Sequence, residues 1–298
     1  MKSDFNLLPL FLAVADTRNF RAAADRLGVT RSAVSQGVRR LEDQFGAQLV
    51  ARTTRAVSLT EAGQRLRDAL SRPMSEIAGA MERGADDAVP RGHLKIAVTS
   101  IAEAFLSGPL VASFAAAYPH VTLDVTVTDE EFDIVAEGFD AGVRLGEVIE
   151  QDMIAVPLTG EQREMVVAAP AYLDRHGRPE TPADLLQHRC IGWRPGPQVA
   201  PYRWEFRTDD KSFSIAVEPQ ISSNDLRFLL RTALAGGGIT FATADTFRPH
   251  VERGELVSLL EDHLPPFPGF YLYFPQRSDL SPKLRAMVDH IRRTRRAD

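Results

Sequence analysis

The chain has 298 residues, of which 44% are hydrophobic and 25% charged, a composition typical of a folded protein with two domains or two lobes. It contains no run of about 18 apolar residues and no signal-peptide pattern at its N-terminus. We therefore expect a cytoplasmic protein without a membrane span. The single cysteine, Cys190, excludes an intrachain disulfide and fits a reducing compartment.

The net charge of -5 is unevenly distributed along the chain. Residues 1–60 hold nine Lys or Arg against five acidic residues, whereas the remainder holds 26 basic and 35 acidic residues. The first 60 residues therefore carry +4 and the rest carries -9. A small basic module on a larger acidic body predicts that polyanion binding is confined to the N-terminal end.

The N-terminal module begins with two predicted helices. The apolar positions of the first are Leu7, Leu10, Phe11 and Val14. Proline is tolerated only in or near a first turn, so Pro9 places the start of this helix. The second helix lies in "NFRAAADRLGV", where three alanines allow close packing and Gly28 supplies the left-handed stop that helix ends favour.

A third helix is predicted in "RSAVSQGVRRLE", residues 31–42, with Thr30 as its N-cap. Val34, Val38 and Leu41 have the spacing of one buried helix face. The opposite face carries side chains that donate hydrogen bonds: Arg31, Ser32, Ser35, Gln36 and Arg39. Two helices joined by a short turn with glycine form a helix-turn-helix, whose second helix lies in the DNA major groove. The alternative for this stretch alone is a solvated helix face.

The segment "AQLVARTTRAVSLT" alternates like two short strands around Thr53 and Thr54. Arg52 and Arg55 flank the turn, and an arginine at such a tip can enter a narrow minor groove, where the negative potential is enhanced. We interpret the segment as a β wing that contacts double-stranded DNA. An ordinary hairpin is the alternative.

Residues 11–63, from "FLAVADTRNF" to "VSLTEAG", resemble the winged helix-turn-helix of LysR-type transcriptional regulators, and the resemblance continues less specifically to the C-terminus. In that family the residues just inside the third helix reach base edges, which maps onto Arg31, Ser32, Ser35 and Gln36. The family's wing arginine maps onto Arg55. Many members have Gln-Pro where this chain has Arg31-Ser32, so base preference is not transferred.

After the DNA-binding domain, residues 1–60, comes a predicted linker helix over residues 61–90. The apolar positions near heptad spacing are Leu59, just before this helix, and Leu66, Leu70, Met74, Ile77 and Met81 within it. Pro73 predicts a kink within it. The resemblance implies that this helix pairs two subunits, giving a homodimer or homotetramer on a pseudo-palindromic operator. A lone helix packed on its own domain is the alternative.

Residues 91–298 alternate between strands and helices, which predicts parallel sheets covered by helices. We expect strands in 93–98, 121–127 and 140–146, with helices in 101–118 and 133–138. The resemblance implies the two-lobed α/β fold of periplasmic solute-binding proteins, with a small-molecule effector between the lobes. The expected lobes are residues 92–162 with 268–298, and residues 163–267.

Candidate effector-binding residues lie at strand ends and helix starts, where ligands of such sheets bind. They are Thr99, Ser100, Thr128, Arg144 and Asn224. The helix near the last of them is expected to begin at Ser223, Asn224 or Asp225. Thr99 and Ser100 offer hydroxyls and backbone N–H groups that suit a carboxylate or another anion. Simple helix capping is the alternative for Thr99, Ser100 and Asn224, as a structural salt bridge is for Arg144.

Other motifs do not indicate a cofactor or a metal. "AGGGIT", residues 235–240, follows a helix and lacks the ending of a nucleotide-binding loop, so we interpret it as a helix end turning into a strand. Cys190 and His188 are too few to form a metal site. The rings of Trp193, Tyr202, Trp204 and Phe206 could stack on an aromatic effector, but the alternation of this segment favours a hairpin in which most of them pack.

Three classes of function are considered. A ligand-responsive DNA-binding transcriptional regulator explains both halves of the chain. A solute-binding component of a transporter explains only the second half and needs a signal peptide. An enzyme is not favoured, because no nucleophile, metal cluster or carboxylate pair stands at an interpretable spacing. No motif identifies the effector, the operator, the target genes or the choice between activation and repression.

Overall fold

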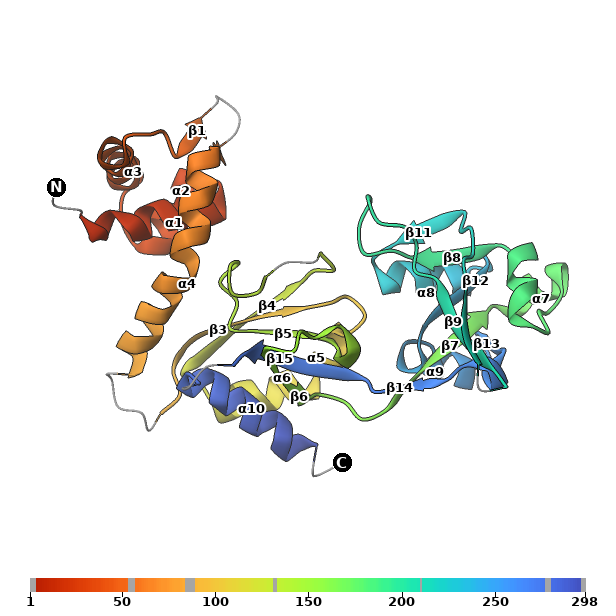
Figure 1. Ribbon diagram of the computed structural model, residues 1–298. Coiled ribbons are helices and arrows are strands. Elements are labelled where there is room, and N and C mark those ends of the chain that lie inside the picture. Colours follow the sequence, from red (N-terminus) through yellow and green to blue (C-terminus); the bar gives the residue numbers. More distant parts are fainter. Residues whose placement is uncertain are drawn as a thin grey trace. The chain divides into compact units, whose positions relative to one another are not determined.

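The computed structural model describes residues 4–52, 57–83, 89–130, 133–209, 211–276 and 280–295. The chain forms two compact units, shown in Figure 1. The first unit comprises residues 1–85 with 135–138, and the second comprises residues 86–134 and 139–298.

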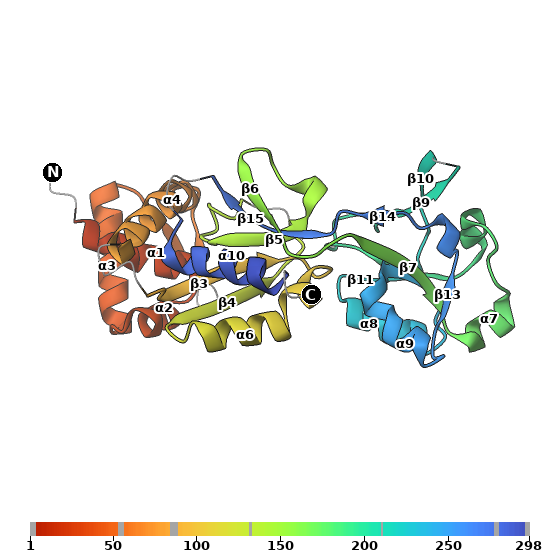
Figure 2. The same cartoon turned by 90° about the horizontal axis from the view of Figure 1, so that it is seen from below.

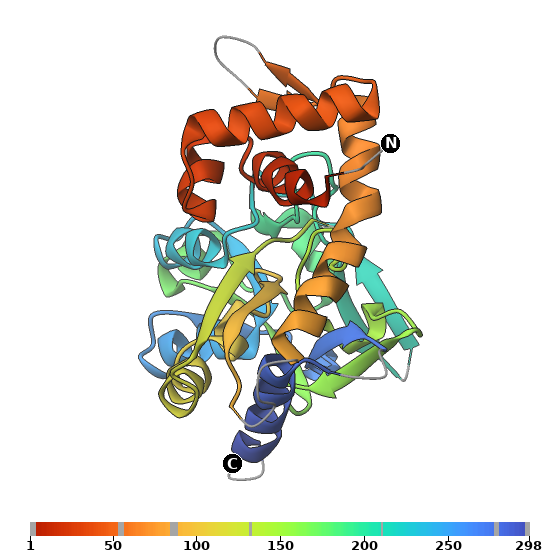
Figure 3. The same cartoon turned by 90° about the vertical axis from the view of Figure 1, so that its left-hand side faces the viewer.

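The first unit is built from a short 3-10 turn and four helices. They are η1 (Phe5–Leu7), α1 (Leu8–Thr17), α2 (Phe20–Leu27), α3 (Arg31–Phe45) and α4 (Glu61–Arg83). Figure 3 shows α3 lying across α1. The core between the helices includes Phe11, Val14, Ala23, Val34 and Val38, none of which is exposed. The three predicted helices of this unit are therefore confirmed.

The turn from α2 to α3 is fixed by local signals. The Asn19 side chain accepts hydrogen bonds from the backbone N–H groups of Arg21 and Ala22 and caps α2. Gly28 ends α2 with a φ of +66°, in the left-handed region that glycine adopts without steric cost. The Thr30 hydroxyl accepts from the N–H of Ala33 at 3.2 Å, as predicted for the N-cap of α3.

A two-stranded wing follows α3. Strand β1 (Val50–Arg52) pairs antiparallel with β2 (Val57–Leu59). The Glu42 carboxylate of α3 accepts from the backbone N–H groups of Leu49 and Val50 at 2.9 and 3.0 Å, which ties the wing to the helix. The predicted turn at Thr53, Thr54 and Arg55 lies outside the described residues.

The linker helix α4 runs as one helix of 23 residues with Pro73 inside it. Leu66 and Leu70 pack against the core of the first unit, whereas Ile77 is 52% exposed. The predicted apolar line is therefore divided between two environments. Leu66 and Leu70 stabilise the helix's own unit, whereas the exposed Ile77 is available for a contact outside this core. The side chain of Met81 lies outside the described residues.

The first sheet of the second unit has five strands in the order β4-β3-β5-β15-β6. They are β3 (Gly92–Val98), β4 (Val121–Val127), β5 (Ala141–Leu145), β6 (Met153–Pro157) and β15 (Phe270–Pro275). Strand β3 is parallel to β4 and β5, but β15 is antiparallel to β5 and β6. The expectation of an all-parallel sheet was wrong, because the chain returns late to insert β15 between β5 and β6.

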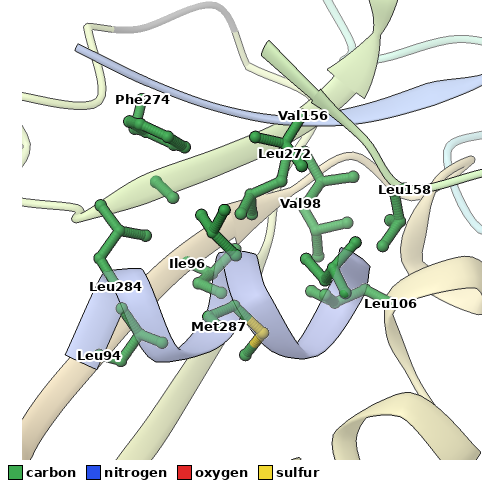
Figure 4. Close-up of a cluster of buried hydrophobic side chains, with 14 of the residues drawn as sticks. Leu94, Ile96, Val98, Leu106, Val156, Leu158, Leu272, Phe274, Leu284 and Met287 are labelled. Atoms are coloured by element: carbon green, nitrogen blue, oxygen red, sulfur yellow. The ribbon is translucent and has the colours of Figure 1, made fainter. Parts of the chain in front are cut away.

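Helices cover this sheet and bury its apolar face. They are α5 (Glu103–Leu106), α6 (Pro109–Ala117) and α10 (Pro282–Thr294). Figure 4 shows Leu284 and Met287 of α10 beside the side chains of Leu94, Ile96 and Leu272. The Lys283 ammonium binds the carbonyl of His93 and the Asp140 carboxylate, so the first turn of α10 is anchored to the sheet.

Two helices predicted after residue 91 were wrong. The helix expected over residues 101–118 is split into α5 and α6, because Ser107 has an extended backbone, Gly108 has a φ of +68° and Pro109 starts a new helix. The helix expected over residues 133–138 is absent, and residues 134–138 form turns. This segment is too short to repay the cost of helix nucleation without a packed apolar face.

The second sheet has the strand order β11-β8-β12-β7-β13, with β14 pairing at the start of β7. Its strands are β7 (Gln162–Ala168), β8 (Cys190–Trp193), β11 (Ile221–Ser223), β12 (Ile239–Thr243), β13 (Val257–Leu259) and β14 (Pro266–Phe267). Strand β8 is parallel to β11 and β12, and β7 is antiparallel to β12, so this sheet is also mixed.

Helices and a hairpin surround the second sheet. The elements are α7 (Pro170–His176), α8 (Leu226–Leu234), α9 (Ala244–Glu252), and the paired strands β9 (Trp204–Thr208) and β10 (Lys211–Ile215). Figure 2 shows α8 and α9 side by side. The hairpin buries Trp204 and Phe206 as predicted, Cys190 is a buried packing residue, and the glycines after α8 lead into β12. Three 3-10 turns complete the unit: η2 (Gly146–Val148), η3 (Pro182–Gln187) and η4 (Glu261–His263).

The packing of α4 against the wing predicts an unusual response to a glycine substitution. Gly63 is buried, and a Cβ atom there would fall on the backbone carbonyl oxygen of Leu49. Gly63→Ala should lower the free energy of unfolding of the first unit by about 1–3 kcal/mol, although alanine is the better helix former. Thermal unfolding of the full chain measures this loss. The exposed control Ala69→Ser should leave stability almost unchanged, and a Gly63→Ala protein as stable as the wild type would refute the contact.

Candidate DNA-reading face and effector site

Helix α3 separates a buried face from a polar exposed face. Val34, Gly37, Val38 and Leu41 are buried against α1 and α2. Of the predicted DNA-contacting residues on this helix, Arg31, Ser32, Gln36 and Arg39 are exposed, and Ser35 is half-buried. The Gln36 amide lies 3.4 Å from the Ser32 hydroxyl, so these two side chains share one patch. The packing of one face therefore fixes which side chains the other face presents.

A groove of about 690 Å³ continues from this face toward the wing. Its lining residues are Arg39, Glu42, Asp43, Gly46, Ala47, Gln48 and Val50. Arg39 belongs both to the exposed face of α3 and to the groove. Arg52 lies on β1 opposite Val57, while its side chain and the whole of Arg55 lie outside the described residues. The predicted role of Arg52 and Arg55 stays a prediction.

In the second unit, the predicted residues Thr99 and Ser100 follow directly after β3. The backbone N–H of Ser100 donates to the Asp129 carboxylate at 2.8 Å. Its hydroxyl accepts from the indole N–H of Trp193 at 3.1 Å. The Thr99 hydroxyl oxygen is buried and has no hydrogen-bond partner within the described part of the chain.

The carboxyl ends of β3 and β8, one from each sheet, meet in this unit. Ser100 follows β3 of the first sheet, and Trp193 ends β8 of the second, so their hydrogen bond joins the sheets. Arg227, in the first turn of α8, lies 4.0 Å from the Glu103 carboxylate in the first turn of α5. The strand ends that the sequence identified as candidate positions are therefore brought together from two sheets.

The other predicted effector residues are partly used by the fold. The Thr128 hydroxyl accepts from the N–H of Glu130 at 3.3 Å. The Arg144 guanidinium donates to the carbonyl of Glu130 at 3.3 Å and lies 5.7 Å from the centre of the Tyr273 ring. Asn224 is exposed and precedes Asp225, whose carboxylate accepts from the N–H groups of Arg227 and Phe228 and is the actual cap of α8.

Three residues at these strand ends were missed by sequence reasoning: Asp129, Trp193 and Glu164. Asp129 directly follows the predicted Thr128, and a carboxylate at a strand end is the signal that could have found it. Trp193 was assigned to hairpin packing, yet it lies before the hairpin. Glu164 is an acidic residue within a strand that is otherwise buried toward its end.

The carboxyl group of Glu164 lies in an unusual electrostatic environment. Glu164 pairs with Thr243 across β7 and β12, at the edge where β8 and β12 end. Burial, together with the nearby carboxylates of Glu205 and Glu147, raises the pKa of Glu164 to about 8. Burial also raises the pKa of Asp129, against the hydrogen bonds from Ser100 that lower it.

Comparison with protein families covers almost the whole chain. Residues 5–64 match the model of the bacterial regulatory helix-turn-helix protein, lysR family. Residues 87–296 match the LysR substrate binding domain. The chain belongs to the LysR family of transcriptional regulators. As a LysR-family regulator, it binds DNA through the helix-turn-helix and small molecules through the substrate-binding domain.

Relatives of this LysR regulator span its full length. A putative transcriptional regulator of Pseudomonas aeruginosa is 40% identical over 296 residues, which cover 99% of this chain and 97% of the relative. The uncharacterized HTH-type transcriptional regulator YcaN of Escherichia coli is 36% identical over 293 residues, which cover 98% of this chain and 96% of YcaN.

Solved structures share the fold of this LysR regulator. The full-length virulence activator AphB of Vibrio cholerae has a TM-score of 0.65 at 22% identity, covering 97% of this chain and 98% of AphB. The regulator CrgA of Neisseria meningitidis has a TM-score of 0.59 at 26% identity, covering 97% and 99%. The combination of a winged helix-turn-helix with a two-lobed α/β domain is thereby confirmed.

The described residues of the LysR regulator lack both a membrane-spanning helix and a metal-binding cluster. No described helix is long and apolar enough to cross a bilayer. No group of three or more His, Cys, Asp or Glu side chains that could hold a metal ion occurs among the described positions.

The environment of Glu164 predicts a pH-dependent stability. A carboxyl pKa that is higher in the folded than in the unfolded state costs stability progressively as pH rises from 4.5 to about 8. Glu164→Gln removes this titration, so the variant should gain stability over the wild type across that range, by at most about 1.4 kcal/mol per pH unit. Thermal unfolding at pH 5, 6, 7 and 8 measures the difference. An exposed control, Glu161→Gln, should follow the wild type, and a Glu164→Gln curve parallel to the wild type would contradict the assigned environment.

Proposed function

We propose that this LysR regulator reads a pseudo-palindromic operator with the exposed face of α3, as a homodimer or homotetramer, and responds to a small effector bound between its two sheets. The observation that carries the DNA-reading proposal is the division of α3. Val34, Val38 and Leu41 hold the helix in its unit, and side chains with hydrogen-bond donors occupy the opposite face.

The chemistry of that face suits base edges in the major groove. Arginine pairs with guanine, glutamine with adenine, and serine with either base or with phosphate. We assign base contacts to Arg31, Ser32, Ser35 and Gln36, and a backbone contact to Arg39, which also borders the groove toward the wing. The positive charge of residues 1–60 supports attraction to DNA without determining sequence.

We place the effector at the facing strand ends of the second unit. Ser100 is the point where β3, the segment after β4, and β8 meet through hydrogen bonds. A ligand that binds there changes contacts on both sheets at once, which is what a shift between two lobe arrangements requires. A solute-binding component of a transporter would account for this unit alone, and the helix-turn-helix does not favour it. A regulator that acts on chromosomal DNA works in the cytoplasm.

The α3 proposal predicts that Gln36 contributes more to operator binding than Gln44 on the same helix. Gln36→Ala should weaken binding to an operator selected from random DNA by about 1–3 kcal/mol and relax preference at particular base pairs. Gln44→Ala is the matched control, because Gln44 lies near the C-terminal end of α3 and accepts from the backbone N–H of Asp4. Mobility shifts with the operator and single-base variants measure both effects. Equal affinity and specificity for the wild type and Gln36→Ala would refute the reading face.

The linker helix predicts a second outcome. Because Leu70 packs within its own unit while Ile77 is 52% exposed, Ile77→Glu isolates the contact between subunits from folding. An acid buried without a partner against a second helix is costly, so this variant should sediment as a smaller species and lose operator affinity. Arg65→Gln, which changes the charge equally at an exposed position of α4, is the control. A wild-type sedimentation profile for Ile77→Glu would place the subunit interface elsewhere.

A further inference from the structure

The backbone N–H groups that follow β3 are bound by acceptors of the chain itself. The Thr99 N–H donates to the carbonyl of Val143 at 3.3 Å, and the Ser100 N–H donates to the Asp129 carboxylate at 2.8 Å. The sequence offered both N–H groups to an anionic ligand, but such a ligand needs donors that are still without a partner. A carboxylate that enters at this strand end has to replace Asp129, which is already attached to the chain.

Both hydrogen-bond donors of Ser100 bind the Asp129 carboxylate. Asp129 is half-buried, two residues after the end of β4, and it bonds the backbone N–H and the side chain of Ser100. Burial raises the pKa of Asp129, and the two bonds from Ser100 lower it, so these donors favour the charged form of the carboxyl group. Asp129 therefore contacts Ser100 in the way that the carboxylate of a bound ligand would.

The Ser100 hydroxyl also contacts the second sheet. Its oxygen accepts the indole N–H of Trp193 at 3.1 Å, so its own proton is left for the Asp129 carboxylate. The backbone N–H of Tyr202 donates to the Trp193 carbonyl at 2.8 Å, and the two rings lie 6.3 Å apart at an angle of 72°. The carboxylate that orients the hydroxyl proton therefore also orients the lone pairs that bind Trp193, and hydrogen bonds in such a chain strengthen one another.

Two arginines near these strand ends are also engaged by acceptors of the chain. The Arg144 guanidinium donates to the carbonyl of Glu130 at 3.3 Å. Arg227, in the first turn of α8, lies 4.0 Å from the carboxylate of Glu103, in the first turn of α5. A ligand anion would have to compete with the acceptors that these cations already have.

We infer that Asp129 is an intramolecular anion that determines effector specificity: it occupies the donors of Ser100, orients the Ser100 hydroxyl toward Trp193, and so excludes carboxylates and phosphates as effectors. This role of Asp129 rests on the proposed effector site and names the ligand class that the site rejects. A second anion beside Asp129 would meet like-charge repulsion in addition to losing its donors. The Thr99 hydroxyl, buried without a partner among the described residues, is left for a polar atom of a ligand that is not an anion.

The test replaces the intramolecular anion with a free one. Asp129→Ala removes the carboxylate and leaves room for formate or acetate beside the donors of Ser100. The full-length variant should lose about 3–8 °C in Tm, and either anion at tens of millimolar should recover about half of the loss, relative to chloride at equal ionic strength. The wild-type protein should respond neither to these anions nor to succinate, benzoate or phosphate, because Asp129 already occupies the donors.

Tryptophan fluorescence shows whether the recovery occurs at Ser100. The chain has two tryptophans: Trp193 bonds Ser100, and Trp204 is buried in the hairpin. Asp129→Ala should shift the emission spectrum, and formate should reverse the shift. Combining Asp129→Ala with Trp193→Phe should remove this response, because only Trp204 then emits. A general effect of salt on stability would not change the emission of Trp193.

Two variants are controls. Asp124→Ala removes an exposed carboxylate of β4 and should keep the wild-type Tm within about 1 °C, with no response to formate. Asp129→Asn keeps an oxygen that accepts from the Ser100 N–H, so it should lose less Tm than Asp129→Ala and should not respond to formate.

The role of Asp129 is overturned if any of these anions raises the Tm of the wild type and shifts its emission, or if Asp129→Ala recovers no better in formate and acetate than in chloride. If Asp129→Ala does not fold in chloride, refolding in formate supports the role, and failure to fold in both salts overturns it.

Operator binding by the wild type separates this inference from the proposed function. The anion titrations report on the second unit, which contains Asp129, whereas mobility shifts with the selected operator report on the first unit. Sequence-specific operator binding together with carboxylate binding to the wild type would refute the role of Asp129 and leave the regulator intact. Recovery of Asp129→Ala in formate without sequence-specific DNA binding by the wild type would refute the regulator and leave the role of Asp129 intact.

Discussion

Ser100 holds together the part of the molecule on which ligand response depends. Its backbone N–H is bound at 2.8 Å by Asp129, which follows β4, and its hydroxyl receives the indole N–H of Trp193, at the end of β8, at 3.1 Å. Ser100, two residues after the end of β3, therefore connects β3 and the segment after β4 with the second sheet. Any ligand that enters between these strand ends has to compete with, or add to, these bonds, and so affects both sheets together.

The hydrogen bonds already formed at these strand ends disfavour an anionic ligand in the second unit. Asp129 occupies the N–H group that would otherwise attract an anion, and Arg144 is engaged by the Glu130 carbonyl and the Tyr273 ring. Among the described residues, the Thr99 hydroxyl is buried without a hydrogen-bond partner. Selectivity at such a site depends on which polar groups already have hydrogen-bond partners in the fold. A buried polar group without a partner costs more free energy than one hydrogen bond contributes.

The sequence was sufficient where a structural feature depends on neighbouring residues. Asn19, Gly28 and Thr30 act within one helical turn, so the two helix boundaries of the DNA-binding motif could be predicted from residue type alone. The buried line Val34, Val38 and Leu41 then determined the exposed face of α3. Residue pattern and structure agree there because the same few contacts decide both.

Features that depend on distant segments could not be predicted in this way. The bond between Ser100 and Trp193 joins residues 93 positions apart, and the insertion of β15 into the first sheet uses a strand from the end of the chain. The apolar pattern over residues 101–118 did not reveal that the helix is interrupted, because the spacing of α5 and α6 continues across Ser107 and Gly108. Leu66 and Leu70 fit a heptad, but only the packed structure shows that they serve their own unit.

We propose that α3 selects particular DNA sequences and that the second unit regulates this selection. Genome-wide mapping of the DNA bound by the wild-type protein tests the claim most directly. We predict discrete sites that share a pseudo-palindromic sequence, with half-sites separated by about one helical turn or a multiple of it. Bound DNA without a common sequence, or sites that share a motif without two-fold symmetry, would contradict it.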